Sequence, residues 1–141
     1  MTIESAIYSH LSTKSSITAL VSDRIYPQIA PNSAEYPFIT YNIVTEDHDH
    51  SMGGATGLAN LILQLDVWAS TVPTQVSLSE ALRNALDGFK GLMGSEDLDI
   101  RNCFLQNRAS FFEPRTEGKE IPDYRTTLDF SIWHVETVPT L

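Results

Sequence analysis

Hydrophobic and polar residues alternate along two stretches of the chain, 58–70 and 124–136. In the first, Leu61, Leu63 and Leu65 alternate with more polar neighbours, and this period of two is typical of a β-strand with one apolar face. Residues 38–46 are rich in β-branched and aromatic side chains, which favour strands. The pattern predicts four strands, at residues 38–46, 58–70, 100–114 and 124–136.

Three other stretches have the spacing of helices. Apolar residues recur every three or four positions over residues 3–11, and a shorter helical turn is expected at 15–23. The clearest helix is expected at 71–88, where Pro73 suits the first turn and Gly88 suits the C-terminal stop. The apolar face predicted for this helix consists of Val76, Leu78, Leu82, Ala85, Leu86 and Phe89.

The remaining stretches are expected to be irregular connections. Residues 24–37 are broken by prolines, residues 91–99 form a turn, and residues 115–123 form a charged loop. The order helix, strands, helix, strands predicts an α+β fold with a mainly antiparallel sheet of about four strands and two main helices packed on one face. The length of 141 residues suits a single domain spanning residues 1–141.

Composition narrows the classes of function. Hydrophobic residues make up 42% of the chain and charged residues 19%, which is typical of a globular protein. The formal net charge of −9 argues against a protein that grips nucleic acid, because phosphate binding depends on Lys and Arg. No apolar run reaches the ~20 residues of a membrane span, and the N-terminus lacks the pattern of a signal peptide. We therefore expect a soluble protein that stays in the cell that makes it.

Cysteine usage excludes one kind of stabilisation. Cys103 is the one cysteine of the chain, so no internal disulfide can form. Because it lies in an apolar run, we expect a small core residue rather than a nucleophile.

The stretch EDHDHSMGGATG, residues 46–57, combines acids, histidines and glycines between two predicted strands. In an extended chain His48 and His50 would share one face and could hold a metal weakly. A structural zinc site usually has four ligands and a catalytic site three. Further ligands would have to come from His10 or His134, and the spacing does not indicate that they do. We expect no metal site and interpret the stretch as a pliable hairpin tip.

Motifs for catalysis are also missing from the sequence. The run MGGATG lacks the Lys-Ser/Thr of a phosphate-binding P-loop and precedes a strand rather than a helix. The GxSxG pattern of a serine nucleophile does not occur. We therefore expect neither catalysis nor a cofactor. A small metal-binding or hydrolytic protein that uses residues 47–50 remains the alternative.

Two surfaces are candidates for contacts with other chains. The first is the stretch 46–57, and the second is the charged stretch 111–125, where complementary charges could select a partner. Trp68 and Trp133 are expected either in the core or at a subunit interface. The candidate interface residues are Glu46, Asp47, His48, Asp49, His50, Ser51 and Met52 in the first stretch, and Glu113, Arg115, Glu117, Lys119, Glu120 and Arg125 in the second.

The order of these segments resembles the tail completion, or tail terminator, proteins of long-tailed bacteriophages and phage-derived particles. Residues 3–31 are similar to the opening helix, short second helix and RIYP turn of that family. Residues 36–70 resemble its P-(F/Y)-(I/V)-x-Y strand, glycine-bearing loop and strand ending in D-x-W-A. Residues 81–91 and 111–134 resemble its L-D-G helix exit, its YE-P loop and its closing strand, although Phe112 stands where tyrosine is common.

The resemblance implies that the protein is a structural component of a virion. It implies a homo-hexameric ring that caps the tail tube, ends tail polymerisation and provides the docking surface for the head connector. The implied partners are further copies of the chain, the major tail tube protein and the head–tail connector or neck protein. DNA would pass through the lumen without specific binding, and no membrane is involved.

The resemblance also implies a location and leaves one alternative open. The protein would lie at the tail–neck junction of the virion after assembly in the host bacterial cytoplasm. A neck protein that joins heads to finished tails, without controlling tail length, fits the same motifs.

Overall fold

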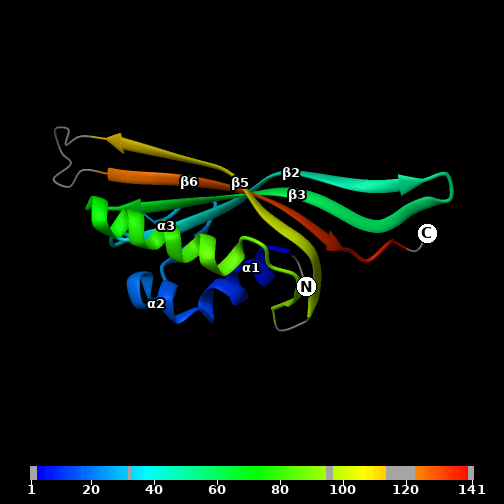
Figure 1. Ribbon diagram of the computed structural model, residues 1–141, viewed down its shortest axis with the longest axis horizontal. Helices are drawn as coiled ribbons and strands as arrows, with labels where there is room; N and C mark the ends of the chain where they lie inside the picture. Colours follow the sequence, from blue (N-terminus) through cyan, green and yellow to red (C-terminus); the bar gives the residue numbers. More distant parts are fainter. Residues whose placement is uncertain (1–2, 32, 95–96, 114–122, 140–141) are drawn as a thin grey trace.

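The computed structural model describes residues 3–31, 33–94, 97–113 and 123–139. Within them the chain forms three helices and six strands (Figure 1). None of these helices is long and apolar enough to cross a membrane. The elements, in chain order, are α1 (Ile3–Ser12), α2 (Ser15–Val21), β1 (Ile25–Pro27), β2 (Phe38–Ser51), β3 (Gly54–Ala69), α3 (Val72–Leu86), β4 (Gly91–Met93), β5 (Leu98–Glu113) and β6 (Asp123–Val135).

The sheet is larger than the sequence predicts. Its strand order is β1-β2-β3-β6-β5-β4, and β1 pairs with β2 in parallel while the other neighbours are antiparallel. The prediction of a four-stranded sheet with two main helices is therefore wrong, because β1 and β4 are also formed and the helical turn expected at residues 15–23 is a third helix, α2. Both additional strands have only three residues and lie at the edges. Such a short strand is defined by its partner rather than by its own pattern of side chains.

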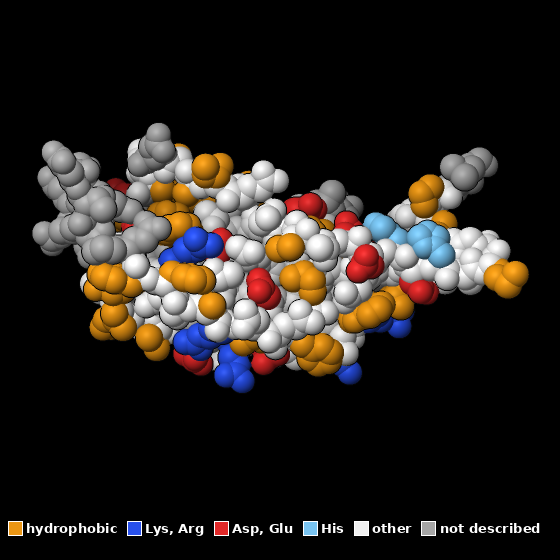
Figure 2. All heavy atoms as spheres, turned by 90° about the horizontal axis from the view of Figure 1, so that it is seen from above, with side chains coloured by type: hydrophobic (Ala, Val, Ile, Leu, Met, Phe, Trp, Pro, Cys, Tyr) orange, Lys and Arg blue, Asp and Glu red, His pale blue; other side chains and the backbone are white. Residues whose placement is uncertain are grey.

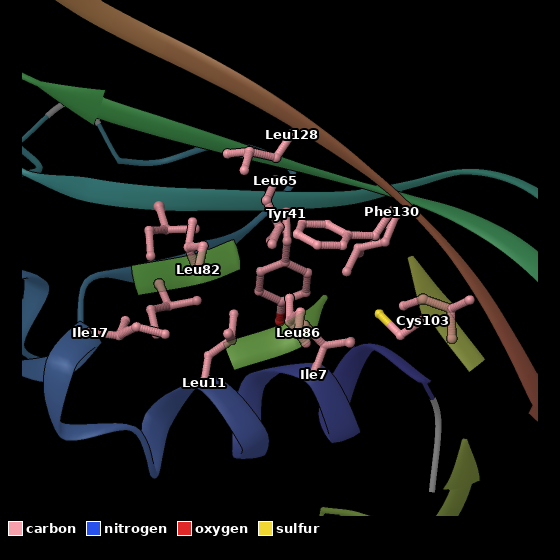
Figure 3. Packing of buried hydrophobic residues seen from close by; sticks show 14 of the residues in the cluster. Ile7, Leu11, Ile17, Tyr41, Leu65, Leu82, Leu86, Cys103, Leu128 and Phe130 are labelled. Atoms are coloured by element: carbon pink, nitrogen blue, oxygen red, sulfur yellow. The ribbon is translucent and has the colours of Figure 1, made fainter. Parts of the chain in front are cut away.

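The helices cover one face of the strongly twisted sheet (Figure 1). The side chains of β3 that face them are fully buried leucines and valine, and β6 contributes Leu128, Phe130 and Ile132. These residues pack against Ile7, Leu11 and Ile17 from the first two helices (Figure 3). The alternation in the sequence thus correctly identifies the buried face of both central strands.

The N-terminus of α3 is where the sequence predicts it, whereas its buried face is not. The Thr71 side chain accepts a hydrogen bond from the backbone N–H of Thr74, which is the arrangement of an N-cap. The predicted apolar face is partly wrong, since Val76 is 47% exposed and Ser79 is fully buried. Ser79 satisfies its hydroxyl locally by donating to the carbonyl of Gln75 at 2.7 Å. The helix is therefore rotated slightly from the orientation that the apolar pattern alone favours.

The cysteine lies where the sequence predicts. Cys103 is fully buried on β5, within the core between sheet and helices (Figure 3). Burial is the main cause that raises the pKa of its thiol to about 12, with Asp87 as a smaller one. The thiol is therefore protonated near neutral pH, and the interpretation as a core residue is confirmed.

Candidate functional site

The stretch 46–57, here called the arm, is the outer part of a long β-hairpin that projects beyond the helices (Figure 1). The predicted hairpin between the two strands is confirmed, but its strands extend through most of the stretch, to Ser51 and from Gly54. All side chains from Val44 to Thr56 are exposed. Histidine side chains lie on the arm beside acidic ones (Figure 2). The arm is thus a two-stranded ribbon with water on both faces.

The tip of the arm is a turn of two residues, Met52 and Gly53. Ser51 pairs with Gly54, and the Ser51 hydroxyl accepts a hydrogen bond from the backbone N–H of Gly53 at 3.2 Å. Gly54 has φ +116°, a conformation that residues with a Cβ rarely adopt. Local sequence therefore closes the hairpin without help from the rest of the fold.

The base of the arm is tied to the segment that follows β6. The backbone N–H of Glu136 donates to the carbonyl of Gly57 at 2.8 Å. Gly57 has φ +85°, and a Cβ there would lie 3.4 Å from the carbonyl oxygen of Glu136. Glycine is favoured here by the backbone conformation, because residues with a Cβ rarely adopt this φ. The segment that follows β6 is thus hydrogen-bonded to the base of the arm.

A side-chain contact strengthens the same connection. His48 Nδ1 lies 2.7 Å from Glu136 Oε1, although 88 positions separate the two residues in the sequence. The hydrogen bond to Glu136 is the largest cause that raises the pKa of His48, and the charges of Glu136, Glu46 and Asp47 act in the same direction. The charged form of His48 is therefore favoured in the folded protein.

We expect an NMR titration in chelator-treated buffer to place the pKa of His48 above about 6.5, the ordinary value for histidine. Since the folded pKa is raised, the contact with Glu136 stabilises the arm fully below the unfolded pKa. The stabilisation is lost as the pH rises through the folded pKa. Glu136→Gln should move the pKa of His48 back toward its ordinary value. An unchanged pKa in that variant would show that the contact is not formed in solution.

The base of the arm also gathers groups that could ligate a cation. One donor atom from each of Glu46, His48 and Glu136 lies within 4.8 Å of the others. His134 is not in this group, although its Nε2 lies 3.7 Å from Glu46 Oε1. His50 is not in this cluster, and a register shift separates it from His48. Sequence analysis missed Glu136, because only the pairing of strands brings it near.

The other histidine considered as a ligand has a structural role. His10 is buried on α1, and its Nε2 lies 3.0 Å from the carbonyl oxygen of Ala85. Its ring also packs edge-on against Phe89, with 4.6 Å between ring centroids. Burial is the main cause that lowers the pKa of His10. This histidine therefore joins α1 to the end of α3.

The described parts of the second candidate surface, residues 111–113 and 123–125, lie at the other end of the sheet from the tip of the arm (Figure 1). Glu113 ends β5 and pairs in register with Asp123. The side chain of Arg125 is already engaged, with an ion pair to Asp66 at 3.5 Å and its guanidinium over the rings of Trp68 and Phe111. The predicted interface residues Arg115, Glu117, Lys119 and Glu120 lie outside the described residues.

Several aromatic side chains are exposed, and of these Phe104 was not among the residues considered from the sequence. Phe104, Phe111 and Phe112 of β5 are about half exposed, and Trp133 of β6 is 39% exposed. Trp68 is instead half-buried, stacked on Phe38 and donating its indole N–H to Thr40. The unusual pair of phenylalanines at the end of β5 was the available signal, since only one side chain of two neighbours on a strand can face the core.

A ribbon exposed on both faces and a set of exposed aromatic side chains elsewhere on the sheet are typical of a protein that acts through contacts with other chains. The family model described as tail completion protein gp17 matches residues 5–134, so the chain belongs to this family of virion tail proteins. The resemblance noted in the sequence is thereby confirmed. Among curated proteins no match is found.

The fold has a counterpart among solved structures. A chain in the virion of a native gene transfer agent particle is similar, with a TM-score of 0.68 and 17% sequence identity. The alignment covers 96% of this chain and 95% of that chain. At this identity the likeness shows the fold. Family membership makes the protein a structural component of the virion tail that contacts other proteins of the tail and of the head–tail region.

Proposed function

We propose that this chain forms a ring on the end of the tail tube, ends tube polymerisation and offers the head connector a docking surface. The ring is a homo-hexamer, and its partners are the tube protein and the connector or neck protein. The arm, residues 46–57, makes the contact with a neighbouring subunit or another tail protein. Support for this function comes from the family and from the two open edges of the sheet.

Each edge of the sheet has a stretch without an outer strand partner among the described residues. These two stretches lie at opposite ends of the sheet. On one edge β1 covers β2 only at Ile39–Tyr41, so β2 has no outer strand partner from Asn42 to Ser51 in the described chain. On the other edge β4 covers β5 only at Leu98–Ile100. The β5 edge from Gln106 to Glu113 has no outer strand among the described residues. Unpaired backbone groups of this kind can bind a strand from another chain.

Two unlike edges suit a closed ring. In a ring each subunit joins the next through two different surfaces, whereas a two-fold dimer uses the same surface twice. The arm edge and the β5 edge differ in side chains as well as in position, since the arm carries acids and histidines and the end of β5 carries Phe111 and Phe112. This difference is the observation that carries the proposal.

The acidic balance of the chain agrees with a channel for DNA. The formal net charge is −9, and a ring of six copies would multiply it. A negative lumen repels the phosphates of DNA and lets the duplex pass without sticking. The acids at the base of the arm are candidates for part of that surface.

Electron microscopy of particles assembled without this chain tests the proposed function. We expect over-long tail tubes that are detached from full heads, and rescue when the chain is supplied from a second copy of its gene. Tails of normal length that remain separate from heads would mean that the protein only joins heads to finished tails. Intact particles with attached tails would contradict the proposal altogether.

A further inference from the structure

The base of the arm has an acidic hollow that also contains a buried histidine. A cavity of about 540 Å³ is lined by Glu4, Glu46, Asp97, Asp99, His134 and Glu136 among others, and no Lys or Arg lines it. Arg101 lies nearby but pairs with Asp99 at 3.1 Å. So much negative charge in one hollow attracts a cation. Acidic residues alone do not define a metal site. The residue that indicates one here is His134.

His134 presents an unpaired nitrogen to this hollow. The residue is only 4% exposed, and its Nε2 has no hydrogen-bond partner. Its other ring nitrogen, Nδ1, lies 3.4 Å from the carbonyl oxygen of Val135, which can only accept a hydrogen. In a neutral ring with its proton on Nδ1, Nε2 carries the lone pair that a metal ion needs. This nitrogen lies 3.7 Å from Glu46 Oε1, so the two side chains form an ion pair if the ring is protonated and two neighbouring ligands if it is neutral.

Strand pairing explains why these side chains meet. His48 of β2 pairs with Ala59 of β3, and Ala59 in turn pairs with His134 of β6. The two histidines thus flank an alanine in one row across the sheet. In the neighbouring row, Glu46 pairs with Leu61. Glu136 then follows β6 and returns over His48 at 2.7 Å.

We propose that Glu46, His48, His134 and Glu136 bind one divalent zinc ion at the base of the arm. Two imidazoles and two carboxylates form a four-ligand set of the kind that zinc accepts in tetrahedral geometry. Imidazole donors favour zinc and similar transition metals over magnesium and calcium, which prefer oxygen ligands alone. This inference revises the expectation from the sequence, in which no supporting ligands could be identified.

Three of the four donor groups already lie near one another, and His134 lies 3.7 Å from one of them, Glu46. Zinc–nitrogen and zinc–oxygen bonds of about 2.0–2.2 Å separate neighbouring tetrahedral ligands by roughly 3.4 Å. The donor atoms of Glu46, His48 and Glu136 already lie within 4.8 Å of one another. The first two side chains are exposed and free to move, while buried His134 is the fixed ligand. His48 exchanges its hydrogen bond with Glu136 for a shared bond to the metal.

The bound ion would join two segments that are far apart in the sequence. Glu46 and His48 belong to β2, His134 belongs to β6, and Glu136 lies beyond that strand. Zinc would thus fix the base of the arm to the C-terminal segment and define the direction in which the arm projects. The proposal stands independently of the ring, because a single folded chain supplies all four ligands.

Calorimetric titration of the full chain with zinc chloride tests this site, after removal of any affinity tag and treatment with chelator. We expect one zinc ion per chain, and magnesium chloride should give no comparable binding. His48→Gln and Glu136→Gln should each weaken zinc binding at least about tenfold, since each removes one ligand. His50→Gln is the matched control, because it removes an exposed histidine from the same arm and should leave zinc binding unchanged.

Nitrogen NMR of the imidazole rings gives a second measurement that does not depend on a variant. Zinc should shift the ring nitrogens of His48 and His134, while those of His10 and His50 should stay in place. No zinc binding at millimolar metal would overturn the proposal. Equal binding in the wild type, His48→Gln and Glu136→Gln would also overturn it, because the ion would then be held by surface groups elsewhere.

Discussion

Shortening the arm should abolish assembly while leaving the chain folded. In the variant, residues 49–58 are replaced by Asn-Gly, which joins His48 to Ala59, two residues that already pair across the hairpin. Asn-Gly suits a two-residue hairpin turn. The removed side chains from Asp49 to Thr56 are exposed, but the variant also loses half-buried Leu58 and the hydrogen bond from Glu136 to the Gly57 carbonyl. The free energy of unfolding should therefore fall by about 1 kcal/mol, which is the usual contribution of one such hydrogen bond.

The loss of assembly should be much larger than the loss of stability. If the arm carries the contact with a neighbouring chain, its removal should cost at least about 2 kcal/mol of binding, which corresponds to a fall of roughly 30-fold. The measurement is a count of complete particles by electron microscopy when the variant replaces the wild type. Circular dichroism of the purified variant checks its fold.

Met52→Asn serves as the control for arm length. It gives the tip the same Asn-Gly sequence but keeps the arm at full length, so normal particle numbers are expected. Normal numbers with the shortened arm would contradict the proposed contact. Loss of particles in both variants would instead assign the contact to the side chain at the tip.

The main elements of the fold could be predicted because their patterns are local. Alternation along β3 and β6 identified both central strands and the face that each one buries. The same approach could not find β1 and β4, since three residues are too few to show a period. Each of these strands exists because a longer neighbour offers it a free edge. The predicted sheet was therefore two strands too small, although its centre was right.

The base of the arm could be predicted only in part, because half of it comes from a distant segment. The sequence places Glu46 and His48 together, two positions apart on one strand. It gives no sign that Glu136 lies against His48, because that contact depends on the pairing of β2 with β3 and of β3 with β6. His134 was considered, but its spacing showed no relation to the arm. The pattern of side chains within one strand cannot show which distant residue lies beside it. That depends on how the strands pair in the sheet.

The largest effect on stability should come from Phe130→Ala. Phe130 lies on β6, pairs with Leu63 and Leu105, and is the largest fully buried side chain among the described residues. It packs between the sheet and the helices (Figure 3). Truncation removes apolar contacts and leaves a cavity, at a cost of about 3–5 kcal/mol. This is a large part of the 5–15 kcal/mol by which domains are typically stable.

Phe104→Ala is the matched control, because it makes the same chemical change on the neighbouring strand β5. Phe104 pairs with Ser131 and is 47% exposed, so its truncation leaves no closed cavity and should cost about 1 kcal/mol or less. Urea unfolding followed by circular dichroism measures both variants. The midpoint for Phe130→Ala should fall far below that for Phe104→Ala. Equal midpoints would mean that the sheet face beneath the helices is not the core of the protein. If Phe104→Ala keeps its stability but forms fewer particles, the exposed aromatics of β5 belong to the assembly surface.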